Sequence, residues 1–383
     1  MTFEEARAQF PVLERYAYLN AGTNGPLARS TVEAVVGQVE SDLAGGRSGQ
    51  AWIDRVLALR DEVRTGLAAV IDVDPGLVGI TDSTTRGCGI VIAGLDIGSD
   101  DEIVITDQEH FGLTGPVHAS GARVVVTAAD EESILAAVTP RTRLVATSHI
   151  LWTTGRRLDL ERLREESGVP ILVDGAQSAG AIRVDAKPFD FYTVSAQKWL
   201  CAPEPIGALY VRDPERLRVV SPGYLAQSSY DVSGAFEPKP GGARFDSGWN
   251  ATPTLAGLAA ALATHPEWRY ERAVENAARC HELLAGRVEV VTPPGHSTLV
   301  SFRPNGEPAE LVAALGEQGV IVRELPGRNL VRASVGWWTS EDDLQRLAAG
   351  VYGSPSSDAI GCSASTTVRM WSSSSTPSSS APL

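Results

Sequence analysis

An acid and a lysine, Asp174 and Lys198, each follow an apolar run of the chain. Asp174 comes directly after the run 171–173, and Lys198 comes shortly after the run 189–194. Short apolar runs bounded in this way are typical of strands that are buried on both faces. Open α/β sheets bind ligands beyond the carboxyl ends of their parallel strands. We therefore expect these two side chains to meet at the ligand-binding edge of one sheet.

This pair of side chains suits catalysis by pyridoxal 5'-phosphate (PLP). In that chemistry a lysine holds the cofactor as a Schiff base, and an aspartate pairs with the pyridinium nitrogen so that the ring can accept electrons. A purely structural alternative remains open for each residue taken singly. Asp174 could cap a turn, and Lys198 could be a solvated surface lysine. Their placement after consecutive predicted strands favours the catalytic interpretation.

The sequence motifs around Asp174 and Lys198 resemble those of a known family. VDGAQSAG at 173–180 and SAQKWL at 195–200, followed by a predicted strand at 206–211, resemble the class V aminotransferases. These are fold-type I PLP-dependent enzymes, and cysteine desulfurases and isopenicillin N epimerase-like proteins belong to the same family. The resemblance implies an α/β fold: a large domain with a mostly parallel sheet and a smaller α+β C-terminal domain. It also implies a homodimer with active sites at the interface.

The resemblance assigns a set of residues to the cofactor. The turn DSTTRG at 82–87 opens a predicted helix and would hold the phosphate, because free N–H groups and the helix dipole attract anions there. His110 would stack on the pyridine ring and take part in catalysis with Lys198 and Asp174. RFDSGW at 244–249 is similar to a motif that reaches the partner subunit's phosphate, but Trp249 stands where the family has threonine. The implied cofactor residues are Thr84, Thr85, His110, Asp174, Gln177, Ser195, Gln197, Lys198 and Gly248.

A second set of residues is implied for the substrate. YLNAGTNGPL at 18–27 is similar to the loop that lines the substrate pocket, which implicates Asn20, Ala21 and Thr23. Arg332, in LVRASVGWWT at 330–339, matches an arginine that grips the substrate α-carboxylate through a bidentate fork. Trp152 lies in SHILWTTG at 148–155, where many relatives have asparagine near the ring hydroxyl. Trp152 either reshapes the pocket or leaves Gln177 as the main partner of that oxygen.

The order of predicted elements agrees with this fold. Strands are expected near 77–80, 102–106, 124–126 and 144–148, and they alternate with helices, which is typical of a mostly parallel sheet. Residues 1–15 should form an N-terminal helix that packs with the small domain. The large domain should span 16–250 and the small domain 251–352. Residues 221–242, rich in Gly, Pro, Ser and Tyr, should be irregular, and the Ser-rich residues 353–383 should be disordered.

Composition excludes several classes of function. The chain has 383 residues and a net charge of −14, which argues against a nucleic-acid surface of clustered Lys and Arg. No apolar run approaches the length of a membrane span, and no signal peptide precedes the first helix, so we expect a cytoplasmic protein. The four cysteines are scattered and the histidines show no ligand spacing, which predicts no metal site.

The expected activity is that of a PLP-dependent enzyme acting on an amino acid or amine through a Lys198 aldimine. Desulfuration requires a nucleophilic cysteine, which relatives place shortly before the carboxylate-binding arginine, and 323–328 holds none. Gln197 stands where desulfurases have a proton-shuttling histidine, and an amide cannot shuttle protons. These residues favour an aminotransferase. A C–S β-lyase or an epimerase is the alternative, and a non-catalytic PLP-fold binding protein is a further one.

Overall fold

A seven-stranded sheet forms the centre of the computed structural model, which describes residues 1–353. Its strand order is β2-β8-β7-β6-β5-β3-β4, and only β8 runs against the others. The α/β fold with a mostly parallel sheet is therefore confirmed. The predicted disordered tail lies outside the described residues. The strands are β2 (Val78–Thr81), β3 (Glu102–Thr106), β4 (Arg123–Thr127), β5 (Thr142–Ser148), β6 (Ile171–Asp174), β7 (Phe191–Ser195) and β8 (Gly207–Val211).

Two apolar layers cover the two faces of this sheet. Successive residues of a strand point to opposite faces, so Leu172 packs in one layer and Val173 in the other. Helices α4 and α5 supply Val91 and Leu113 to the layer of Leu172, and α3 supplies Leu67 to the layer of Val173. The helices of this part are α2 (Arg29–Gly45), α3 (Gln50–Val70), α4 (Thr84–Gly94), α5 (Phe111–Ala119), α6 (Glu131–Ala136), α7 (Leu160–Ser167) and α8 (Thr252–Ala263).

A smaller sheet with its own core follows α8. Its four strands are antiparallel in the order β11-β12-β15-β14, and three helices pack on them. The strands are β11 (Glu289–Val290), β12 (Leu299–Arg303), β14 (Arg323–Leu325) and β15 (Leu330–Ser334), and the helices are α9 (Arg269–Leu284), α10 (Pro308–Glu317) and α11 (Glu341–Gly353).

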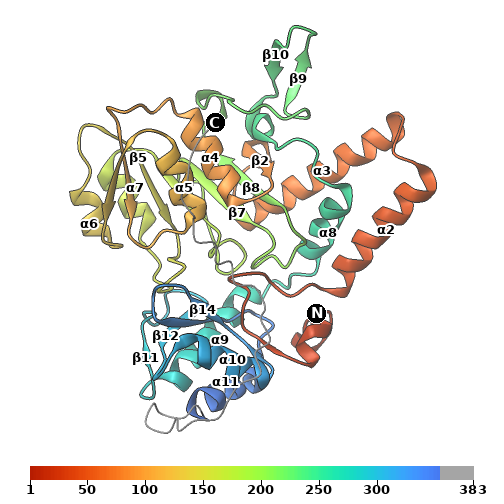
Figure 1. Cartoon of the computed structure of the whole chain (residues 1–383). Helices are drawn as coiled ribbons and strands as arrows, with labels where there is room; N and C mark the ends of the chain where they lie inside the picture. Colours follow the sequence, from red (N-terminus) through yellow and green to blue (C-terminus); the bar gives the residue numbers. More distant parts are fainter. Residues whose placement is uncertain (354–383) are drawn as a thin grey trace, which may run out of the picture.

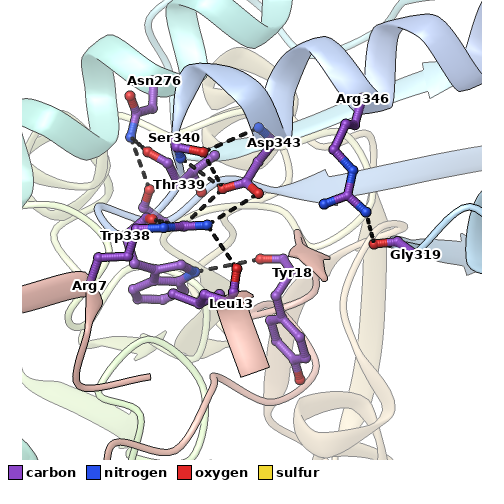
Figure 2. Close-up of polar contacts among 11 residues, drawn as sticks. Arg7, Leu13, Tyr18, Asn276, Gly319, Trp338, Thr339, Ser340, Asp343 and Arg346 are labelled. Atoms are coloured by element: carbon purple, nitrogen blue, oxygen red, sulfur yellow. Dashed lines mark hydrogen bonds and ion pairs between the residues drawn. The ribbon is translucent and has the colours of Figure 1, made fainter. Parts of the chain in front are cut away.

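The first residues of the chain lie against its last described ones. Helix α1 (Phe3–Arg7) begins with the predicted capping box of Thr2 and Glu5. The Arg7 guanidinium donates to the Leu13 carbonyl at 3.0 Å and pairs with the Asp343 carboxylate at 2.9 Å (Figure 2). Strand β1 (Ala17–Tyr18) then pairs in parallel with β13 (Val320–Ile321).

The expected irregular excursion is partly wrong. Within 221–242, β9 (Gln227–Tyr230) and β10 (Phe236–Pro238) form a hairpin that projects from the molecule, at the top of Figure 1. Its residues are mostly exposed, so the strands carry no alternation of apolar and polar residues that the sequence could reveal. Short 3-10 helices occur at Pro11–Glu14, Pro75–Leu77, Pro214–Arg216 and Gly241–Phe245. No helix among residues 1–353 is long and apolar enough to cross a membrane.

Candidate active site

A cavity of about 190 Å³ lies where the carboxyl ends of the central strands approach the smaller sheet. Both sheets and the loop after β1 contribute to it. Most residues predicted for the site line it together, although they come from distant parts of the sequence. The lining residues are Gly22, Thr23, Ser83, Thr84, Thr85, His110, Ser148, Ile150, Trp152, Asp174, Ala176, Gln177, Ser195, Gln197, Lys198, Arg323 and Arg332.

Lys198 lies in the turn after β7 with its amine in this cavity. Within residues 1–353 the amine makes no hydrogen bond or ion pair. Burial lowers the pKa of Lys198, Asp174 opposes this shift and the positive charges of Arg332 and Arg323 add to it, so that the pKa is about 8. A lysine with such a pKa is partly neutral near physiological pH, and only the neutral amine can act as a nucleophile or base.

Asp174 ends β6 on the neighbouring strand, as predicted. Its side chain is buried, and Oδ1 accepts a hydrogen bond from the Ala176 N–H at 2.9 Å. Gly175 makes the tight turn possible, because a Cβ there would lie 2.3 Å from the Thr193 carbonyl. The turn fixes the carboxylate at the cavity wall.

His110 is the N-cap of α5, and its Nδ1 accepts a hydrogen bond from the Gly112 N–H at 3.1 Å. Burial lowers the pKa of His110, and so does the positive charge of Lys198. The ring is therefore neutral, with Nδ1 as acceptor and the proton on Nε2. Its edge contacts Trp152 at a centroid distance of 5.4 Å. The imidazole thus has a fixed orientation at the cavity.

The start of α4 forms another wall. Ser83 caps this helix by accepting a hydrogen bond from the Arg86 N–H at 3.2 Å. The hydroxyls of Thr84 and Thr85 make no hydrogen bond within the described chain, and both residues line the cavity. Unpaired hydroxyls and N–H groups at the positive end of a helix suit an anion such as a phosphate.

Three polar residues near the lysine bond mainly to the protein. Gln177 donates from Nε2 to the Gly22 carbonyl at 2.9 Å and accepts at Oε1 from the Trp199 indole at 3.1 Å. Ser195 donates from its hydroxyl to Gln197 Oε1 at 2.8 Å. The contacts of Gln177 fix the loop before α2 against the lysine turn.

Arg332 is a buried cation that lines the cavity. It is 1% exposed, donates to the Trp152 carbonyl at 2.7 Å, and its Nε has no partner. Burial and, to a smaller extent, the positive charge of the nearby Arg323 lower the pKa of Arg332 to about 9. An unsatisfied guanidinium in a cavity is suited to a carboxylate ligand.

Three predicted residues lie elsewhere. Asn20 and Ala21 do not line the cavity, although Asn20 Oδ1 accepts a hydrogen bond from the lining residue Thr23 at 2.8 Å. Gly248 is also absent from the lining and lies against Gly223. Its predicted contact belongs to a partner subunit's site, so it stays a prediction.

The sequence did not indicate Arg323, Gly22 or Glu109. Arg323 lies opposite Arg332 across two antiparallel strands, and this register cannot be read from the sequence. Gly22 lies so close to Arg332 that a Cβ would be 2.7 Å from its Nη2. Glu109, next to the predicted His110, is buried, and its carboxylate accepts hydrogen bonds from Thr106, Thr147 and Ser148. Burial raises the pKa of Glu109 to about 7.

Comparisons with known proteins agree with this geometry. The chain is 30% identical to an isopenicillin N epimerase of Streptomyces clavuligerus, over 90% of this chain and 96% of the relative. It is 28% identical to a probable cysteine desulfurase of Vibrio cholerae, over 66% of this chain and 70% of the relative. Its fold matches the cystine C-S lyase C-DES with a TM-score of 0.84 and 29% identity, over 90% of this chain and 99% of that one.

A further structure of C-DES, a mutant with glycine covalently linked to its PLP cofactor, matches with a TM-score of 0.85 and 29% identity. It covers 91% of this chain and 99% of that one. The family model of class V aminotransferases matches residues 18–347, which is most of the chain. This chain therefore belongs to the class V aminotransferase family of PLP-dependent enzymes.

Proposed function

We propose that this chain is an enzyme that uses PLP to act on an amino acid, with Lys198 as its central catalytic residue. The observation that carries the proposal is the cavity itself. A half-buried lysine without a hydrogen-bond partner in the described chain lies there with Asp174, and an unsatisfied Arg332 lines the same cavity. A lysine for the cofactor, an acid for its ring nitrogen and a cation for a carboxylate are the groups that PLP catalysis requires.

The residues present fit the cofactor. The free hydroxyls of Thr84 and Thr85 at the start of α4 would hold the phosphate, with Ser195 and Gln197 beside them. Asp174 would pair with the ring nitrogen. Gln177 would contact the ring edge through its carbonyl oxygen, and His110 would cover the ring face. Gly248 would reach the phosphate of the partner subunit in a homodimer.

Arg332 would bind the α-carboxylate of the substrate through its free guanidinium nitrogens. Trp152 and Thr23 would border the rest of the substrate. We assign Asn20 a positioning role, because it accepts a hydrogen bond from Thr23. Ala21, fully buried beside it, would fill the space behind this loop.

PLP, when bound, supplies an electron sink for the bonds at the substrate α-carbon. The amine of Lys198 would take the α-proton, and its pKa of about 8 leaves enough neutral amine to do so near neutral pH. Asp174 would face the ring nitrogen, and His110 would exclude water from one face of the ring. Arg332 orients the substrate so that the α-proton points toward Lys198.

Among the reactions open to this site, we favour β-elimination at a C–S bond. Three cysteines lie in the described residues, Cys88, Cys201 and Cys280, and all are buried away from the cavity, so no thiol is placed to accept sulfur. The likeness to C-DES, whose substrate by name is cystine, supports elimination. Epimerisation is the second candidate, supported by the isopenicillin N epimerase relatives. The aminotransferase expected from the sequence stays a prediction.

The test is to add PLP to the purified chain and record its visible absorption. We expect a band from lysine-bound PLP that Lys198→Ala abolishes, while Lys187→Ala, an exposed lysine paired with Asp72, retains it. A panel of amino acids then separates the reactions. Pyruvate with ammonia indicates elimination, loss of optical activity alone indicates epimerisation, and a keto acid with pyridoxamine phosphate indicates transamination. A wild-type chain that binds no PLP would contradict the proposal.

A further inference from the structure

Two arginines of the cavity lie on neighbouring strands of the smaller sheet. Arg323 on β14 is directly opposite Arg332 on β15 in the antiparallel pair, and both line the cavity. Directly opposed residues of two antiparallel strands project to the same face of the sheet. Like charges in this position repel each other and destabilise the pair, so the arrangement calls for a compensating anion.

No acid of the described chain supplies that anion. Neither arginine forms an ion pair within residues 1–353, and Asp174, the one acid that lines the cavity, makes no ion pair with either of them. Another pair of neighbouring arginines, the buried Arg60 and the half-buried Arg64, is different. Arg60 and Arg64 lie together on α3, and both bind the carboxylate of Asp246, at 2.9 and 2.8 Å. The pair at the cavity lacks the acid that the fold provides elsewhere.

The two guanidinium groups are held by different parts of the molecule. Arg332 donates to the carbonyl of Trp152, which follows the central sheet, at 2.7 Å. Arg323 donates to the hydroxyl of Thr23, in the loop after β1, at 2.9 Å. Each guanidinium therefore has its own anchor and retains further N–H groups for a ligand. This arrangement favours two anions, one at each arginine, over a single anion shared by both.

We propose that the substrate is an amino acid with a second anionic group on its side chain, which Arg323 binds while Arg332 binds the α-carboxylate. The inference rests on the proposed function, because that function assigns the α-carboxylate to Arg332. It narrows the substrate to the acidic class, in which a carboxylate or a comparable anion lies on the side chain. Bidentate arginine–carboxylate contacts would satisfy both guanidinium groups and relieve their repulsion.

Calorimetric titration of the PLP-loaded chain tests this with two ligands that lack an amine and so are not turned over: glutarate, which has two carboxylates, and its monoamide, which has one. We expect glutarate to bind about tenfold tighter, as for a charge-assisted hydrogen bond. Arg323→Gln should remove this preference, and Arg323→Lys should keep part of it. Arg303→Gln is the matched control, because Arg303 lies in the same sheet but pairs with Glu289 on its exposed side.

Equal binding of the two ligands by the wild type would overturn the inference. An Arg323→Gln chain that loses affinity for both by the same factor would also overturn it, because both arginines would then hold one carboxylate. If circular dichroism shows that Arg323→Gln does not fold, the inference is tested by the ratio of the two ligand affinities in the wild type and in Arg323→Lys. The visible PLP band in the same samples separates the two proposals. A band without ligand preference contradicts only this inference, whereas no band contradicts the proposed function.

Discussion

At the scale of single residues, the ionisation of Glu109 makes the stability of the fold depend on pH near neutrality. Its raised pKa of about 7 compares with an ordinary value of 4.5, so the folded chain holds a proton that the unfolded chain releases. The stabilising contribution is complete below about pH 4.5 and is lost as the pH rises through about 7. By linkage the amount at stake is about 3 kcal/mol.

Glu109→Gln should remove this pH dependence. The amide imitates the protonated acid: its carbonyl can accept from Ser148, and its NH2 group can donate to the hydroxyls of Thr106 and Thr147. We expect the free energy of unfolding of the wild type to fall relative to the variant by about 3 kcal/mol between pH 4.5 and 8. Denaturant titrations of both proteins at the two pH values measure this. Parallel pH curves would contradict the assignment.

Whether a site residue could be predicted from the sequence depended on which structural information its placement requires. Lys198 and Asp174 follow apolar strands within a short stretch, so their meeting required only the geometry of a parallel sheet. Arg323 required the register of two antiparallel strands, and Glu109 required three segments to close around one carboxylate. Neither arrangement leaves a local signal in the chain.

At the scale of elements, the loop between β1 and α2 fits tightly against the turn that carries the lysine. The Gly25 N–H donates to the Gln197 carbonyl at 2.8 Å. A Cβ at Gly25 would lie 2.1 Å from the Lys198 carbonyl and 2.9 Å from the sulfur of Cys201. Only glycine fits this contact without moving the backbone of Lys198.

Gly25→Ala should therefore displace the lysine turn. We expect a loss of about 1–3 kcal/mol in the free energy of unfolding, as for overpacking, together with a weaker visible PLP band. Gly37→Ala in α2 is the matched control, since a Cβ there meets nothing within 4 Å and alanine favours helix. Unchanged stability and cofactor binding in Gly25→Ala would show that the backbone adjusts freely.

Strands proved easier to predict than their directions. The apolar runs placed the strands of the central sheet to within about three residues at each end, because buried strands need uninterrupted apolar character. Nothing in the run 206–211 distinguishes β8 as the strand that runs against its neighbours. The exposed hairpin β9–β10 was missed, since exposed strands need not alternate apolar with polar residues.

At the scale of the whole molecule, one apolar surface has no cover within the described chain. Trp249 stacks between Trp52 and Tyr224, yet about half of its side chain is exposed, at 51%. Val39 and Leu43 on α2 are exposed at 50% and 85%. Such surfaces mark interaction sites more often than scattered single residues do. This surface supports the proposed homodimer, in which Gly248, next to Trp249, would approach the partner subunit.

We expect the chain to sediment at twice its mass of 40.6 kDa. Trp249→Glu should shift it toward the monomer, because burying an unpaired carboxylate at an interface is costly. Val274→Glu on α9 of the small domain, where the native side chain is also exposed, should leave the sedimentation unchanged. A wild type that sediments as a monomer over micromolar concentrations would contradict the homodimer.

The contact of Arg7 with Asp343 has a consequence for how the enzyme is made. A ribosome adds Arg7 more than 300 residues before Asp343, and Thr23 likewise precedes the two arginines of the cavity. A nascent chain of the first 250 residues already holds Asp174 and Lys198 but lacks both cations for the substrate. The residues assigned to the cofactor are therefore synthesised before the arginines assigned to the substrate. Arg7 can form its contact with Asp343 only after residues 251–343 have been synthesised.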